Sequence, residues 1–216
     1  MKQLKAAHHL PGSESFASRF PFALDAVGAG RKRRRFSSAA TRQLASSLSV
    51  GEKFDYRVVQ SFGLRSMIGS AAGAAIGQGL NDPEEWGQGA AGLARRFGSG
   101  VGANLARQSV AFALESALHE DPRYFPSEER GKKRRLLNAL KQTFVCRTDD
   151  GRTQFAWGRV ASDFAAGQIQ NAWQPASSRS LGRGIERGLI SLGADAGFNV
   201  AQEFLPFLRS KTVPKP

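Results

Sequence analysis

The chain has 216 residues and a formal net charge of +13, with 41% hydrophobic and 23% charged residues. Its mean hydropathy of −0.35 is too polar for a protein built mainly of membrane-spanning helices, and its single cysteine excludes a framework of intramolecular disulfides. The strong positive charge favours partners that carry phosphate groups, namely nucleic acids or anionic lipid headgroups.

The composition divides the chain into three parts. Residues 1–53 are expected to form a disordered basic tail, because proline, glycine and serine interrupt any regular pattern there. Residues 54–209 are expected to form a helical domain, and residues 210–216 a polar C-terminal tail. The basic tail is interpreted either as an arm that binds nucleic acid or anionic membrane, or as a solvated segment. Its basic cluster consists of Arg31, Lys32, Arg33, Arg34 and Arg35.

The uncharged segment 66–81 dominates the helical domain. Gly69, Gly73 and Gly77 recur there every four residues among alanines and serines. On a helix this spacing removes side chains from one face, so that another helix can approach closely. The pattern predicts a single helix from about Asp55 to Gly79.

Later segments repeat the use of small residues. Asp82 and Pro83 predict the start of a second helical region, which the glycines near 98–102 are expected to break before a clearer helix over 103–119. A helix is expected over 136–144, a small β-hairpin near 143–157 around Asp150-Gly151, and helices over 158–173 and 179–204. These elements predict an all-α, Gly/Ala-rich bundle of about five helices. The last helix carries the small-residue positions Gly184, Gly188, Gly193 and Gly197.

The helical pattern bears on membrane association. The 16 residues of segment 66–81 would span about 24 Å as a helix, whereas the hydrocarbon core of a bilayer is about 30 Å thick. Later segments carry charges within their apolar stretches, and each would cost at least about 2.5 kcal/mol at mid-membrane. A bundle that rests on a bilayer, inserts partly or forms oligomers through glycine faces therefore fits better than conventional spanning helices. The alternative is a soluble bundle whose small residues only allow tight packing.

One string, His119-Glu120-Asp121-Pro122-Arg123-Tyr124-Phe125, gathers ionisable groups at a helix end. It could contribute to a carboxylate-rich site, or its residues could tie a loop to neighbouring helices while His119 caps carbonyl groups. We expect the structural role, with no catalytic residue, metal or cofactor, because the Glu-x-x-His pairs of di-metal bundles do not occur. The candidate polar site comprises Glu115, His119, Glu120, Asp121, Arg123, Tyr124 and Asp195.

Other catalytic and nucleic-acid signatures are missing from the sequence. It contains no Walker A loop, no Gly-x-Ser-x-Gly elbow and no His-Glu-x-x-His motif. A nucleic-acid role would rest on charge alone, in the tail cluster and in a second basic patch. That second patch comprises Lys132, Lys133, Arg134 and Arg135.

Four strings resemble a family of uncharacterised bacterial Gly/Ala-rich helical proteins that carry a HEDPRYF-type motif. They are EKF (Glu52–Phe54), ALHEDPRYF (Ala117–Phe125), TFVCRTDDG (Thr143–Gly151) and GADAGFNVAQEF (Gly193–Phe204). The resemblance covers about residues 52–208 and implies no activity, cofactor or catalytic residue. It implies an export signal before the segment at Glu52, and hence an envelope location. The basic first 50 residues depart from that pattern, so either the start is misassigned or this member is not exported.

Three functional hypotheses follow. The first is a non-enzymatic envelope protein that associates with a membrane, or with copies of itself, through small-residue helix faces. The second is a cytoplasmic, soluble and basic helical module that binds nucleic acid. The third is an enzyme with a site around the HEDPRYF motif.

Overall fold

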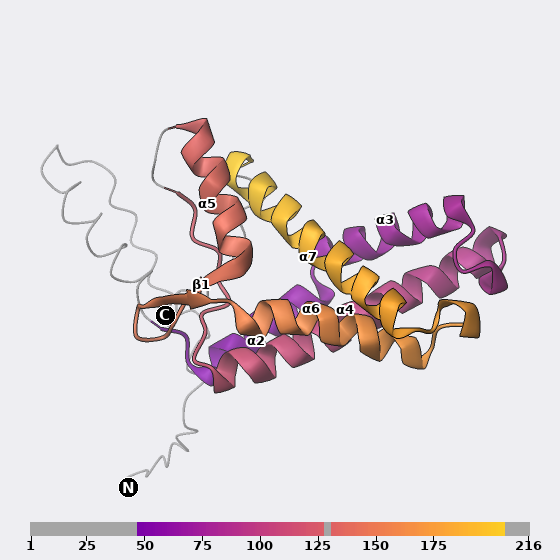
Figure 1. The fold of residues 1–216 in the computed structure, drawn as a ribbon, viewed down its shortest axis with the longest axis horizontal. Coiled ribbons are helices and arrows are strands. Elements are labelled where there is room, and N and C mark those ends of the chain that lie inside the picture. Colours follow the sequence, from indigo (N-terminus) through magenta and orange to yellow (C-terminus); the bar gives the residue numbers. More distant parts are fainter. Residues whose placement is uncertain (1–46, 128–130, 206–216) are drawn as a thin grey trace, which may run out of the picture. The chain divides into compact units, whose positions relative to one another are not determined.

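The computed structural model describes residues 47–127 and 131–205. The chain divides into the units Met1–Leu44 and Ala45–Pro216, and all described residues belong to the second unit. These residues form α-helices and one small hairpin (Figure 1), which confirms the predicted all-α bundle. The basic cluster Arg31–Arg35, most of the expected N-terminal tail and the expected C-terminal tail 210–216 lie outside the described residues.

Helices α2 (Val50–Phe62) and α3 (Leu64–Leu80) replace the single helix predicted over 55–79, so that prediction was wrong. The chain adopts an extended conformation at Gly63, with φ −67° and ψ 160°. A Cβ atom at Gly63 would lie 2.6 Å from the carbonyl oxygen of Val59, which explains why this break contains a glycine. Helix α2 also begins before the expected domain boundary at residue 54.

A capping box starts helix α2. The backbone N–H of Ser49 donates to Glu52 Oε2 over 2.8 Å, and the backbone N–H of Glu52 donates back to Ser49 Oγ over 3.3 Å. These two bonds satisfy donors that the first turn of a helix leaves without partners.

Helix α4 (Gly89–Ala117) runs without interruption through the glycines at 98–102, so the predicted break there was wrong. The glycines instead admit close neighbours. A Cβ at Gly100 would lie 3.4 Å from Ser70 Cβ of α3, and a Cβ at Gly102 would lie 3.5 Å from the Trp173 ring.

Between α3 and α4, the short 3-10 helix η2 (Glu84–Trp86) follows Pro83, in place of the expected start of an α-helix at Asp82.

The second half of the described chain contains the predicted hairpin and three helices. Helix α5 (Lys132–Phe144) leads into strands β1 (Val145–Arg147) and β2 (Thr153–Phe155), which pair antiparallel with Cys146 opposite Gln154. Helix α6 (Trp157–Ile169) ends in the 3-10 helix η3 (Gln170–Ala172), and η4 (Ala176–Ser178) precedes α7 (Leu181–Phe204).

Helix α4 forms the centre of the bundle. It packs against α2, α3 and α6, and α6 in turn packs against α7. Helix α5 lies beside the C-terminal part of α7, away from α4 (Figure 1). Residues far apart in the sequence therefore meet mainly along the inner faces of α4, α6 and α7.

Candidate functional site

Among the described residues, the interior of the bundle is polar and much of its exterior is apolar. The largest side chains that are completely buried include Lys53, Glu115, Glu120 and Glu203. By contrast, Leu64, Leu80 and Leu181 are 76%, 73% and 71% exposed. This is the reverse of the usual arrangement in water, where charged side chains are almost never fully buried unless they are paired.

The first part of the polar interior joins α2 to α4. Arg57 Nε donates to Glu115 Oε2 over 2.9 Å, and Arg57 Nη2 donates to Glu115 Oε1. Arg57 Nη1 donates to Gln108 Oε1 over 2.7 Å. The guanidinium therefore binds the carboxylate with two parallel bonds, a geometry that gives strong pairing. Arg57 is the partner of Glu115 that the sequence analysis missed, because 58 residues separate the two in the chain.

The second part joins α4 to α6 and α7. Arg107 forms ion pairs with Asp163, at 2.5 Å between Nε and Oδ1, and with Asp195 through Nη2. Arg65 Nη2 of α3 lies 3.3 Å from Asp195 Oδ1. Arg107 thus pairs with two buried aspartates inside the bundle, and Arg65 adds a second positive charge at its exposed edge. Burial would lower the pKa of Arg107, but the carboxylates of Asp195 and Asp163 raise it above its ordinary value.

For Asp163, in contrast to Arg107, burial has a larger effect on the pKa than the neighbouring charges have. The side chain of Asp163 is completely buried, and this desolvation raises its pKa although Arg107 and a hydrogen bond from Ser191 Oγ lower it. The ion pair with Arg107 and the bond from Ser191 therefore offset only part of the cost of burying the Asp163 carboxylate.

Glu120 performs a structural task at the start of α6. Its carboxylate accepts hydrogen bonds from the backbone N–H groups of Trp157 and Gly158, over 3.0 and 2.9 Å. A carboxylate in this place satisfies free helix donors and complements the positive end of the helix dipole. Burial raises the pKa of Glu120 despite these bonds.

Gly158 is a further structural residue that the sequence analysis did not single out. A Cβ there would lie 2.6 Å from Glu115 Cγ and 2.9 Å from Glu120 Oε2. Only glycine lets both buried carboxylates approach α6 this closely.

Among the remaining residues of the HEDPRYF string, Asp121 and Arg123 bind each other and Tyr124 binds α7. Arg123 pairs with Asp121 at 2.5 Å, and the Tyr124 hydroxyl donates to Glu203 Oε2 of α7 over 2.6 Å. His119, which we expected to cap carbonyl groups, is 78% exposed and lies 3.5 Å from Asp149. Tyr124 and Glu120 thus connect the loop after α4 to α7 and α6, whereas the Arg123–Asp121 pair lies within the loop itself.

Of the candidate polar residues, the structure brings Glu115 and Glu120 together at Gly158. Asp195 and the Asp121–Arg123 pair bind other partners. Within residues 47–127 and 131–205, no group of three or more His, Cys, Asp or Glu side chains could hold a metal ion. Burial raises the pKa of Cys146 to about 12, so its thiol is a poor nucleophile at neutral pH.

The glycine positions fall into two groups. Gly184 and Gly188 lie against α6, where a Cβ would come within 2.4 Å of Gln168 and 2.6 Å of Phe164, and a Cβ at Gly77 would lie 3.2 Å from Arg96 Cδ. A Cβ meets nothing within 4 Å at four further positions, namely Gly69, Gly73, Gly193 and Gly197. Contact of another helix at those four positions stays a prediction.

Helix α5 exposes both basic and large apolar side chains. Lys132, Lys133 and Arg134 are exposed at its start, while Leu137 and Leu140 are 55% and 42% exposed further along. Arg135, the fourth residue of the basic patch, instead pairs with Glu203 at 2.9 Å. None of the helices in the described residues combines the length and apolarity that crossing a membrane would need.

Comparison of the chain with protein-family models, with characterised proteins and with solved structures gives no match. The resemblance to the bacterial family with the HEDPRYF-type motif therefore stays a prediction.

Proposed function

We propose that this protein is a non-enzymatic, helix-rich component of the cell envelope that binds an anionic membrane surface through its apolar exterior. The observation that carries the proposal is the inverted distribution of side chains. Large apolar side chains are exposed on α3, α5 and α7, while paired charges fill the interior. Extensive apolar exposure is unfavourable in water and is typical of surfaces that contact lipid or another protein.

The charge of α5 supports a lipid surface as the partner. Exposed cations at the start of α5 lie on the same helix as exposed leucines. Helices that combine basic and apolar side chains in this way bind in the plane of an anionic membrane interface. Each lysine or arginine near such a surface contributes about 1 kcal/mol at physiological salt.

The small-residue faces also favour contact with another copy of the chain. The open faces at Gly69 and Gly73 lie on α3 beside the exposed side chains of Ile68 and Ile76. Close approach of two helices is favoured at such faces once they are in lipid. We treat oligomer formation as a consequence of membrane binding and not as its cause.

Flotation of the purified full chain with lipid vesicles tests the proposal. We expect the protein to float with vesicles that contain phosphatidylglycerol, and to float less with vesicles of phosphatidylcholine alone. Leu137→Glu should reduce flotation, because it places a charge within the exposed apolar part of α5. Ala90→Glu is the control, because it adds the same charge at an exposed position in the first turn of α4.

The basic residues are tested separately. Replacing both Lys132 and Lys133 by Gln should weaken binding to the anionic vesicles by tenfold or more, on the order of 1 kcal/mol for each cation. A wild-type chain that stays at the bottom of the gradient with both lipids would contradict the proposal. If that chain instead binds DNA with a steep loss of affinity as salt rises, the nucleic-acid hypothesis would take its place.

A further inference from the structure

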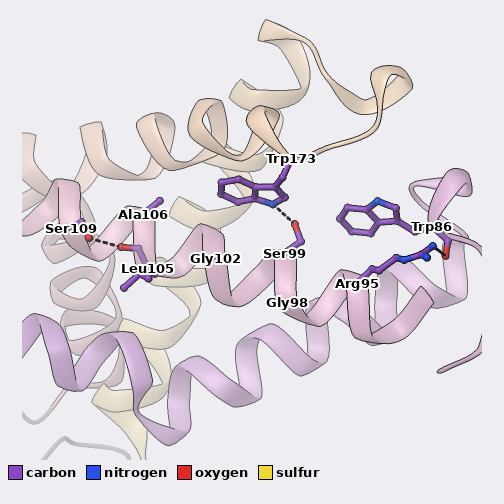
Figure 2. Close-up of a pocket in the computed structure, with 9 residues that line it drawn as sticks. All are labelled: Trp86, Arg95, Gly98, Ser99, Gly102, Leu105, Ala106, Ser109 and Trp173. Atoms are coloured by element: carbon purple, nitrogen blue, oxygen red, sulfur yellow. Dashed lines mark hydrogen bonds between the residues drawn. The ribbon is translucent and has the colours of Figure 1, made fainter. Parts of the chain in front are cut away.

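A groove runs along α4 between two tryptophan side chains. It has a volume of about 550 Å³ and is lined by Trp86, Arg95, Gly98, Ser99, Gly102, Leu105, Ala106, Ser109 and Trp173. Figure 2 shows both indole rings on the same side of α4, with Gly98 and Ser99 on the helix between them. Its volume lies in the range of sites that hold small molecules.

The glycines of α4 create the floor of this groove. A Cβ at Gly98 would meet nothing within 4 Å, and a Cβ at Gly102 would reach the Trp173 ring at 3.5 Å. The Trp173 ring therefore covers Gly102, and the open part of the floor lies at Gly98, between the two tryptophans. Leu105 and Ala106 line the groove further along α4. An apolar molecule can therefore lie against the helix at Gly98.

Hydrogen bonds to Ser99 of α4 fix the position of the Trp173 side chain, which forms one wall of the groove. Trp173 Nε1 donates to Ser99 Oγ over 2.9 Å, and Gln174 Nε2 donates to the same oxygen over 2.9 Å. Ser99 is buried, so its hydroxyl positions the indole and is not directed to a ligand in solvent. The hydroxyl of Ser109 likewise donates to the carbonyl oxygen of Leu105 over 2.9 Å.

The opposite end of the groove carries a cation. Arg95 is exposed, and its Nη1 donates to the carbonyl oxygen of Trp86 over 3.2 Å. A guanidinium has five N–H donors, so donors remain for an anion that approaches beside Trp86. Planar carboxylates suit this group because they accept two parallel hydrogen bonds.

We infer that this groove binds one long-chain fatty acid, with the acyl chain over Gly98 and against the Trp173 ring, and with the carboxylate at Arg95. The apolar floor and the internally bonded serines favour an alkyl chain over a sugar or nucleotide, each of which needs several polar partners. Charge complementarity at Arg95 selects an anionic head. This inference does not depend on membrane association.

Quenching of tryptophan fluorescence by dibromostearate tests it on the full chain in detergent-free buffer. The Trp157→Phe variant serves as the background, because Trp157 lies outside the groove at the start of α6. Emission then comes from Trp86 and Trp173 alone. We expect saturable quenching at one fatty acid per chain. Quenching that rises without saturation would overturn the inference.

Two variants locate the ligand. Gly98→Leu fills the floor and should abolish saturable quenching, whereas Gly193→Leu makes the same change at another open helix position and should not. Equal quenching in both variants would contradict the inference. Circular dichroism checks that each variant keeps its helices.

Arg95→Gln tests the head group without filling the groove. We expect it to weaken stearate binding at least about tenfold, because the neutral amide loses the charge-assisted hydrogen bonds to the carboxylate. Competition by stearyl alcohol should be unchanged by the same variant. If stearate fails to compete while brominated phosphatidylglycerol in vesicles quenches both tryptophans, the occupant is a bilayer lipid and the inference is wrong.

Discussion

The inner faces of α4, α6 and α7 and the outer faces of α3 and α7 use the same residue types in opposite ways. On the inner faces glycines contact neighbouring backbone, as at Gly167, where a Cβ would lie 2.2 Å from the carbonyl oxygen of Gly184. On the outer faces, glycines such as Gly73 have nothing within 4 Å and lie among exposed leucines and isoleucines. Glycines four residues apart therefore mark a bare face, but they do not show whether the chain itself covers it.

The difference extends to charge. Ion pairs such as Arg57–Glu115 fill the inner faces, whereas exposed leucines and isoleucines lie on the outer faces of α3 and of the N-terminal half of α7. A buried ion pair is costly to desolvate and is stable only while both partners remain. The interior should therefore respond to substitution more strongly than the exterior.

The largest effect is expected from removal of one interior charge. Arg57→Met should reduce the free energy of unfolding by roughly 3–5 kcal/mol, because it leaves the Glu115 carboxylate buried without its partner. Urea denaturation followed by circular dichroism measures this. The double variant Arg57→Met with Glu115→Met should recover much of the loss, and an equal loss in both variants would argue against pairing as the cause.

A smaller effect is expected from added volume between α6 and α7. Gly167→Ala should cost about 1–3 kcal/mol, the usual range for overpacking, because its Cβ would overlap the backbone of Gly184. The same denaturation experiment measures it. A neutral result would mean that the two helices are farther apart than the structure indicates.

The smallest effect, with the opposite sign, is expected on the outer face of α3. Gly73→Ala should increase the free energy of unfolding by about 0.5–1 kcal/mol, because alanine fits the open position and favours the helix. Gly167→Ala and Gly73→Ala make the same chemical change, the first on an inner face and the second on an outer face, so their effects can be compared directly. A loss of stability at Gly73 would show that another helix covers this face in the protein as purified.

Local sequence signals predicted the parts of the fold that depend on neighbouring residues. Asp150-Gly151 between two short runs predicted the hairpin, and Gly151 indeed has a positive φ of 82°. Small residues at Gly184 and Gly188 predicted a close helix contact, and these glycines lie against α6. Such signals lie within a few residues of the feature they specify.

Features that depend on tertiary contacts could not be predicted in this way. Whether a glycine breaks a helix depends on what lies beside it: Gly63 separates α2 from α3, whereas Gly98 and Gly100 lie inside a continuous α4. The partners of the candidate polar residues were missed for the same reason. Arg57 reaches Glu115 only because α2 packs on α4, and no local pattern carries that information.

Whether the apolar exterior faces lipid can be decided by fractionation of cells that express the untagged protein, with high-salt and carbonate washes of the membrane pellet. We expect recovery with the membranes and retention after the salt wash, because apolar contacts outlast the screening of charge. Complete recovery in the soluble fraction from the start would contradict the claim that the apolar exterior faces lipid.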